Sequence, residues 1–150
     1  FNSTYMETYN TRQDTNLVKV EVTCESLAVK MGSVVFSLKS KSDPFDFIEL
    51  ENVNDSTWIE KGNLYAHNVF EAVTHFALDS AQMPNKMEII KGTKVFYAFS
   101  EEGMAKNFIT DHTSFSHEYK DGGSNVFRVT KKIELVIDHP GIVEENDQNT

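Results

Sequence analysis

The residues best suited to chemistry in this chain are His67, Glu71, His75 and Asp79, which recur at every fourth position. The apolar spacing of residues 64–82 predicts a helix, and on a helix this row lies along one face with neighbours about 6 Å apart along the axis. Two side chains at that separation can share a metal ion, and imidazole and carboxylate groups are ordinary zinc ligands. The row therefore raises the question of a metal or acid–base site.

Helix geometry weakens this hypothesis. Positions eight apart lie about 12 Å from each other along a helix, so His67 and His75 cannot hold one ion together. A catalytic zinc needs three protein ligands, and the third would have to come from the surroundings of His112, His117 or His139. We interpret the row as the solvent-facing side of an amphipathic helix.

No other motif makes a sharper chemical claim. Residues 110–119 contain two His, two Ser and several carboxylates, but a nucleophile on a G-x-S-x-G turn is absent. Phosphate-binding glycine loops and the D-x-[DN]-x-[DN]-G order of a calcium loop are also missing from the sequence. We therefore predict no catalytic residue, no cofactor and no metal, and a protein that is not an enzyme.

The composition excludes two classes of partner. The formal net charge is −9 and the pI is near 4.9, so phosphate backbones are repelled on average and nucleic acid is not expected as a partner. No apolar run approaches the roughly 20 residues that span a bilayer, so we expect a soluble protein without a membrane partner.

The cysteine content and the first residue bear on localisation. Cys24 is the only cysteine, which rules out an internal disulfide and is compatible with a reducing cytoplasm or a virus particle. We interpret it as a small residue at the end of a strand. Because residue 1 is Phe and not Met, we expect a proteolytically processed or trimmed product, and the compartment is left open.

Three regions differ in composition. Residues 1–16 are polar and rich in Asn and Thr, which predicts an N-terminal arm. Residues 17–140 have the apolar content of a single α+β domain, in line with the length of the chain. Residues 141–150 follow a Pro–Gly pair and read as an acidic C-terminal tail.

Alternating apolar residues predict strands in several regions. Val18, Val20 and Val22 alternate with polar residues across residues 17–23, which is typical of a half-buried strand. A longer alternation in residues 126–137 follows a Gly–Gly pair that permits the positive φ of a hairpin turn. Further strands are expected in residues 43–53, in residues 110–119, and in residues 87–100 as two short strands or one bent strand.

Helical spacing predicts the remaining elements. The principal helix, about residues 64–82, starts after the N-cap residue Asn63 and ends before Pro84. Residues 26–40 fit either a helix or a strand, with a slight preference for helix, and residues 101–109 fit a short helix. The sum is an α+β fold, a mainly antiparallel sheet of about five to seven strands with one principal helix packed on it.

Two function classes follow. The first is a non-catalytic structural or protein-interaction component of a larger assembly, such as a virion-like particle or a filament, whose terminal arms contact copies of itself or other subunits. Its expected interface residues are Tyr5, Tyr9, Val18, Val20 and Val22. The alternative is a small-molecule- or metal-binding protein, or a metal-dependent enzyme, that uses the His67/Glu71/His75 helix face.

Overall fold

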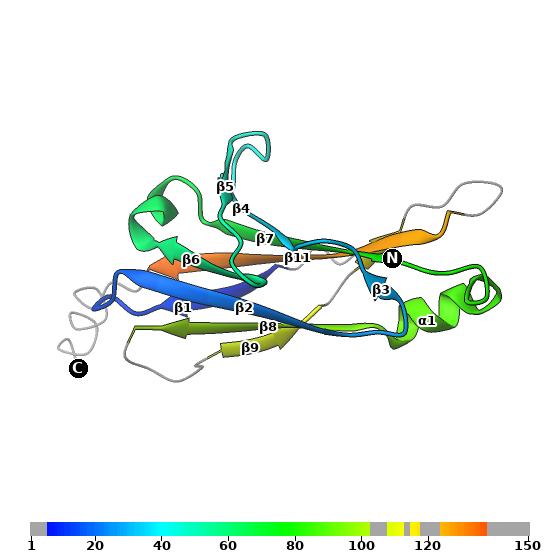
Figure 1. Cartoon of the computed structure of the whole chain (residues 1–150). Coiled ribbons are helices and arrows are strands. Elements are labelled where there is room, and N and C mark those ends of the chain that lie inside the picture. The colour runs from blue at the N-terminus through cyan, green and yellow to red at the C-terminus, as the bar shows by residue number, and fades with distance from the viewer. Residues whose placement is uncertain (1–5, 103–107, 113–114, 118–123, 138–150) are drawn as a thin grey trace, which may run out of the picture.

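The computed structural model describes residues 6–102, 108–112, 115–117 and 124–137. Two β-sheets pack face to face, and a short helical segment lies at one end of them (Figure 1). The prediction of a mainly antiparallel α+β fold is confirmed, with a low helix content. The described part contains eleven strands, more than the five to seven expected.

The larger sheet has seven strands and places its first and last strands side by side. Its main spatial order is β1 (Glu7–Thr11), β11 (Val126–Ile137), β7 (Val69–Ala77), β4 (Val35–Lys39) and β5 (Phe47–Leu50). In addition, β10 (Phe115–His117) pairs with β11, and β3 (Val29–Lys30) pairs with β7. All these pairs are antiparallel except β1 with β11, which run parallel.

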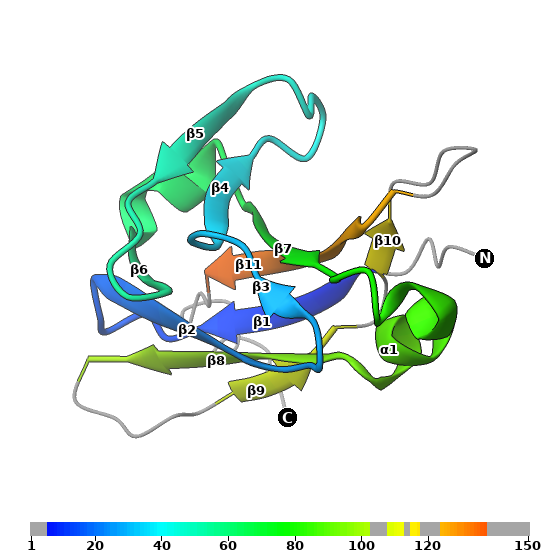
Figure 2. The same ribbon diagram turned by 45° about the vertical axis from the view of Figure 1, so that its right-hand side comes forward.

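The smaller sheet has four antiparallel strands. Their spatial order is β6 (Ser56–Glu60), β2 (Leu17–Glu25), β8 (Lys94–Glu101) and β9 (Phe108–Asp111). Figure 2 shows β1 beside β2 and β8, where the margins of the two sheets approach each other. The β4–β5 hairpin projects at the opposite margin in both views.

The core lies between the sheets and is built by alternation along the strands. Val18, Val20 and Val22 of β2 all point inward and are buried, as the period of two predicts. Phe70 of β7 meets Phe99 of β8 edge to face, with ring centroids 5.6 Å apart. Burying each such side chain stabilises the fold by roughly 1.5–3 kcal/mol.

The prediction of a principal helix over residues 64–82 is wrong, because most of this segment is strand β7. Phe70, Ala72, Thr74 and Phe76 alternate into the core and are all buried. A buried Thr among them and apolar residues on the outer face hide the period of two and imitate the helical period. β-Branched Val and Thr in the segment favour the strand.

The helical segment lies further along the chain. The 3₁₀ turn η2 (Met83–Asn85) leads into α1 (Lys86–Gly92), where two short strands or one bent strand were expected. Ile89 and Ile90 are adjacent in sequence, and α1 buries both of them. Residues 94–100 of the same region do form a strand, within β8. A second 3₁₀ turn, η1 (Lys61–Tyr65), follows β6.

Three further predictions meet the structure in different ways. Residues 26–40 contain β3 and β4, so the preference for a helix there is wrong; Gly32, with φ of 67°, lies between the two strands. Of residues 101–109, Glu101 ends β8, Glu102 is in a turn, and residues 108–109 begin β9, whereas residues 103–107 lie outside the described residues. The Gly–Gly turn also lies outside them, whereas β10 and β11 pair antiparallel as expected of a hairpin.

The predicted N-terminal arm differs from the structure from residue 7 onward. β1 pairs with β11 in the register Glu7 to Ile133, so it is part of the domain and not a free arm. The reason is the alternation of Tyr9 and Thr11, which face the core and are buried there. The boundary at residue 140 and the acidic tail, residues 141–150, lie outside the described residues.

Candidate interaction surface

The row of His67, Glu71, His75 and Asp79 does not form a metal site in this fold. Because Glu71 and His75 lie on strand β7, four residues span about 13 Å instead of the 6 Å of a helix. Even neighbouring members of the row are then too far apart to share an ion. Within the described residues, no three His, Cys, Asp or Glu side chains are grouped to hold a metal.

Two members of the row have partners of another kind. Glu71 lies opposite Lys132 in the sheet, and its carboxylate is 2.8 Å from Lys39 Nζ and 3.8 Å from Lys132 Nζ. His67 Nε2 lies 2.9 Å from Asp46 Oδ1, just before β5. These contacts connect neighbouring parts of the larger sheet, and they leave Glu71 shielded between two cations.

A buried carboxylate, Glu101, sits where β1 approaches β8. Tyr9 Oη, Thr15 Oγ1 and Lys61 Nζ lie 2.6–2.7 Å from its oxygens, and the Arg12 N–H donates to both of them. Burial opposes ionisation, but these donors, led by Lys61, outweigh it and lower the pKa of Glu101 to about 2. The side chain is inaccessible to solvent, so this cluster stabilises the fold and has no access for a substrate.

A second ion pair, between the buried Lys131 and the partly exposed Glu7, joins β11 to β1 and β9. Lys131 is 1 % exposed and its Nζ lies 2.8 Å from Glu7 Oε1, which also accepts a hydrogen bond from Thr110 Oγ1. Burial opposes ionisation of Glu7, and the bonds from Lys131 and Thr110 overcome it and lower the pKa of Glu7. This pair is again a structural connection between strands that are distant in sequence.

Two further side chains of reactive types, Cys24 and His112, have shifted pKa values. Burial raises the pKa of the Cys24 thiol, which lies in β2 one residue before its end, as predicted. Burial also lowers the pKa of His112, whose Nδ1 accepts a hydrogen bond from the Val95 N–H. A raised thiol pKa disfavours the nucleophilic thiolate of Cys24.

The interface residues expected from sequence lie mostly in the core of the chain. Tyr9, Val18, Val20 and Val22 are all buried between the two sheets. Tyr5 lies outside the described residues. The period of two identified the buried face of β2 correctly, but a buried face of a sandwich strand packs against its own second sheet and is not exposed to a partner.

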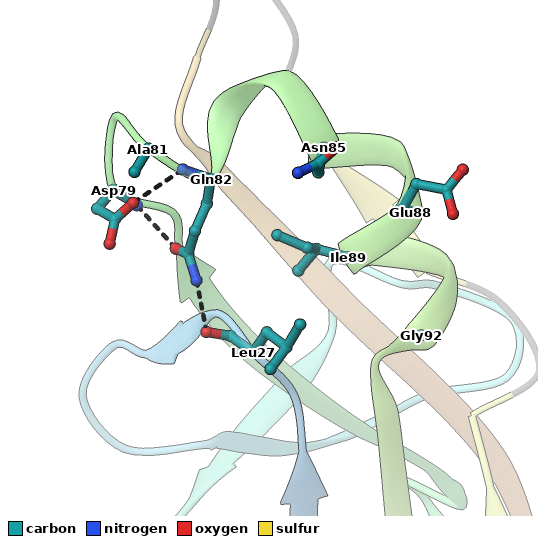
Figure 3. A pocket seen from close by; sticks show the side chains of 8 residues that line it. All are labelled: Leu27, Asp79, Ala81, Gln82, Asn85, Glu88, Ile89 and Gly92. Atoms are coloured by element: carbon teal, nitrogen blue, oxygen red, sulfur yellow. Dashed lines mark hydrogen bonds between the residues drawn. The ribbon is translucent and has the colours of Figure 1, made fainter.

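A pocket of about 670 Å³ opens beside the helical segment (Figure 3). Eight residues line it: Leu27, Asp79, Ala81, Gln82, Asn85, Glu88, Ile89 and Gly92. Its polar groups are largely engaged with one another, because Gln82 exchanges hydrogen bonds with Asp79 and donates a third, of 2.8 Å, to the Leu27 carbonyl. The lining contains no His, Cys, Ser, Lys or Arg, and its ionisable groups are the carboxylates of Asp79 and Glu88.

Three exposed aromatic side chains lie on β5 or near it. Phe45 is 89 % exposed, Tyr65 is 75 % exposed and Phe47 is 47 % exposed. The contact between His67 and Asp46 brings the end of η1 to the start of β5, so the three rings belong to one region. We call Phe45, Phe47 and Tyr65, together with strand β5, the aromatic edge.

The aromatic edge is also an open strand edge. Within the described residues β5 pairs with β4 on one side and is the terminal strand of the sheet on the other. The Ser40 N–H donates to the Asp46 carbonyl, and residues along an antiparallel pair alternate between facing the partner and facing away. The backbone carbonyl of Asp46 and the backbone N–H and carbonyl groups of Ile48 and Leu50 therefore point toward β4. The N–H and carbonyl groups of Phe47 and Glu49 point toward the open side.

Trp58, Ile109 and Met87 are exposed elsewhere and are less suited to contact, whereas Leu27, Val29 and Met31 form a second exposed apolar group on and beside β3. Trp58 on β6 is half exposed, but Lys19 Nζ lies over its ring at 4.9 Å from the centroid. Such a cation covers the aromatic face and keeps it hydrated. Ile109 on β9 and Met87 on α1 are exposed singly, which is ordinary for a protein surface.

The sequence contained part of the signal for the aromatic edge. Residues 43–53 were expected to form a strand with Phe45 and Phe47 on one face, and β5 covers the centre of that range. The alternation of one strand does not tell whether it lies at the edge of a sheet, because that depends on the order of all the strands. Tyr65 was assigned to a helix, so its place beside β5 could not be foreseen.

Comparisons with known proteins leave this two-sheet fold without a relative. No protein-family model matches the chain, and no curated protein and no solved structure is significantly similar to it. In the described part, no helix is both long enough and apolar enough to cross a bilayer.

Proposed function

We propose that this chain is a non-catalytic protein-interaction component of a larger assembly, and that it contacts a partner through the aromatic edge. The observation that carries the proposal is the coincidence of three exposed aromatic rings with an open strand edge. Aromatic side chains are enriched among residues that dominate binding energy, and open strand edges are templates for adding another strand.

The polar clusters support a non-catalytic role. The charges of Glu101 and of Glu7 with Lys131 are held inside the fold by hydrogen bonds within the chain. Catalytic groups need to reach a substrate, which the inaccessible side chain of Glu101 does not. The alternative, a site on a helix face formed by His67, Glu71 and His75, required helical spacing of these residues. Glu71 and His75 lie on strand β7 instead, so this spacing is absent.

The nature of the assembly stays a prediction. A virion-like particle or a filament would each need a repeated contact, and one open strand edge supplies one such contact per chain. Contacts of residues 1–5 and 141–150 with neighbouring chains remain part of the proposal from sequence.

Site-specific photo-crosslinking tests the proposal. A benzoylphenylalanine replaces Phe47 in one variant and Met87, which is exposed on α1, in the control. We expect the Phe47 variant to give an adduct with one defined protein in cells, and the Met87 variant to give none. Equal adducts from both positions would contradict the proposal.

Reconstitution makes the test quantitative. The cross-linked partner, purified, is titrated with the parent chain, with Phe45→Ser/Phe47→Ser, and with the control Met87→Ser. Losing two aromatic anchors is expected to raise the dissociation constant by about tenfold or more. This corresponds to a loss of at least about 1.4 kcal/mol of binding free energy. Undiminished binding of the double variant would rule out the aromatic edge as the contact.

A further inference from the structure

We propose that the occupant of the aromatic edge is an extended, basic segment of another protein, which adds to β5 as a further strand. This inference rests on the proposed function and specifies its partner. It differs from the expectation that the chain contacts copies of itself, and charge decides between the two.

The backbone of β5 is ready to receive a strand. The N–H and carbonyl groups of Phe47 and Glu49 point to the open side, as the Ser40–Asp46 hydrogen bond and the strand register require. An added strand satisfies these groups through main-chain hydrogen bonds, which need no particular side chains. The backbone thus accounts for the extended form of the occupant.

The side chains of β5 select the composition of that strand. Phe47 and Glu49 are exposed on the outer face, whereas Ile48 and Leu50 pack against the core. Cross-strand neighbours on one face interact most strongly as apolar pairs and as opposite charges. A partner that places an apolar residue near Phe47 and a cation near Glu49 matches both positions.

The charge around β5 is one-sided. Residues 42–60 contain six Asp or Glu and no Lys, Arg or His. Glu49 and Glu51 are exposed and take part in none of the ion pairs found within the described residues, whereas Asp55 lies 2.9 Å from Lys30. The nearest lysines, Lys39 and Lys41, are engaged with other carboxylates on the sheet. The edge therefore presents uncompensated negative charge to whatever binds it.

A second copy of the chain is a poor occupant for the same reason. Pairing β5 with β5 would bring Asp46, Glu49 and Glu51 of each copy to one junction with no lysine or arginine from either strand. Like charges across a strand pair are destabilising, and a net charge of −9 on each copy adds repulsion at longer range. The tail of residues 141–150 is acidic as well and is disfavoured in the same way.

Three synthetic peptides test the inference on the full chain. The first is a capped peptide of about eight residues, the length of an ordinary strand, in which Lys and Val alternate at every second position and Thr fills the others, so that one face carries both Lys and Val. The second replaces every Lys by Glu, and the third carries an N-methyl group on every backbone amide of the basic peptide, so that neither of its edges can donate hydrogen bonds to β5. We expect only the first to bind measurably by titration calorimetry, and to protect the Phe47 and Glu49 amides from hydrogen exchange.

Two variants of equal charge separate a local site from general attraction. Glu49→Gln/Glu51→Gln removes two charges at β5, and Glu25→Gln/Glu88→Gln removes two exposed charges elsewhere. The first pair is expected to weaken binding of the basic peptide by about tenfold and the second by less than about twofold. Equal weakening by both pairs, or equal binding of the N-methylated peptide, would overturn the inference.

The mass of the purified chain distinguishes this inference from the proposed function. A dimer that Phe45→Ser/Phe47→Ser converts to a monomer would make a second copy the occupant, which overturns the inference and leaves the proposed function standing. A second set of results has the same meaning. In it, the monomer binds none of the peptides, the variant with benzoylphenylalanine in place of Phe47 still captures one defined partner, and Phe45→Ser/Phe47→Ser abolishes binding of that purified partner. A monomer with equal adducts at Phe47 and Met87 would overturn both.

Discussion

The phenolic hydroxyl of Tyr9 donates a 2.6 Å hydrogen bond to Glu101 Oε2, although 92 residues separate the two in sequence. Tyr9 lies on β1 of the larger sheet and Glu101 ends β8 of the smaller one. The bond therefore ties the two sheets together at the margin opposite the aromatic edge. It also makes the ionised state of one carboxylate important for the whole fold.

Acid is expected to destabilise the protein through Glu101. Its pKa falls from 4.5 to about 2 on folding, so its contribution is complete above pH 4.5 and is lost as the pH drops toward 2. Glu7 and Asp55 shift in the same direction. Glu101→Gln is expected to lower the free energy of unfolding near neutral pH by about 2 kcal/mol. It should also flatten the acid dependence, measured by urea unfolding.

Glu102→Gln serves as the matched control, because Glu102 is the exposed neighbour of Glu101. It should leave both the free energy and its acid dependence unchanged. An unaltered acid slope in Glu101→Gln would mean that another group controls acid unfolding.

The ion pair between the partly exposed Glu7 and the buried Lys131 predicts unequal costs for substituting its two members. Glu7→Gln leaves the buried ammonium facing a neutral amide, which costs about 2–3 kcal/mol. Lys131→Met replaces the charge by an apolar chain of similar length, and Glu7 is accessible enough to be hydrated, so the cost is at most about 1 kcal/mol. Urea unfolding of both variants checks the order, and the reverse order would show that Lys131 is the better-solvated partner.

Two buried threonines predict opposite effects of the same substitution. The Thr74 hydroxyl is buried and has no hydrogen-bond partner within the described residues, whereas the Thr11 hydroxyl donates to the Val136 carbonyl at 3.0 Å. Thr74→Val should stabilise by about 1 kcal/mol because an unsatisfied polar group is removed. Thr11→Val should destabilise by about 1 kcal/mol. Thermal melting compares them, and equal signs would contradict the assignment of partners.

Two phenylalanines predict that the aromatic edge does not stabilise the fold. Phe45→Ser changes an 89 % exposed side chain and should alter the free energy of unfolding by less than about 0.5 kcal/mol. Phe70→Ala creates a cavity between the sheets and should cost about 3–5 kcal/mol. A large cost for Phe45→Ser in denaturant unfolding would assign this ring a role in folding instead of binding.

Zinc is expected to leave the melting temperature unchanged. Ligands that bind only the native state raise it, and the described His and carboxylate side chains are not grouped to hold an ion. Thermal melting with added zinc and with a chelator tests this. A zinc-dependent rise that His67→Ala/His75→Ala abolishes would restore the metal-binding alternative.

The strands with clean alternation were predictable from the sequence. Residues 17–23 and 126–137 became β2 and β11 because each has one fully buried face. Residues 69–77 were mistaken for a helix because Thr74 occupies a buried position and both faces of β7 carry apolar residues. Tertiary packing, which a single sequence does not display, decided between the two periods.

The surface was less predictable than the strands. An edge is defined by which strands do not pair, and the order β1-β11-β7-β4-β5 brings together segments from the whole chain. Val18, Val20 and Val22 looked available for a partner only while the second sheet was unknown. The acidic composition of residues 42–60, in contrast, was visible from the start and acquires meaning once β5 is seen to be terminal.

Because β1 pairs with β11, the first strand can take its place in the sheet only after the last strand has been synthesised. Glu7 finds its counter-ion Lys131 only after 124 further residues have been made. At about 5–20 residues per second, the first strand waits on the order of ten seconds on the ribosome before its place in the sheet exists. Closing so long a loop is slow, and molecules that have not yet closed it expose the edge of β11 to chaperones and proteases.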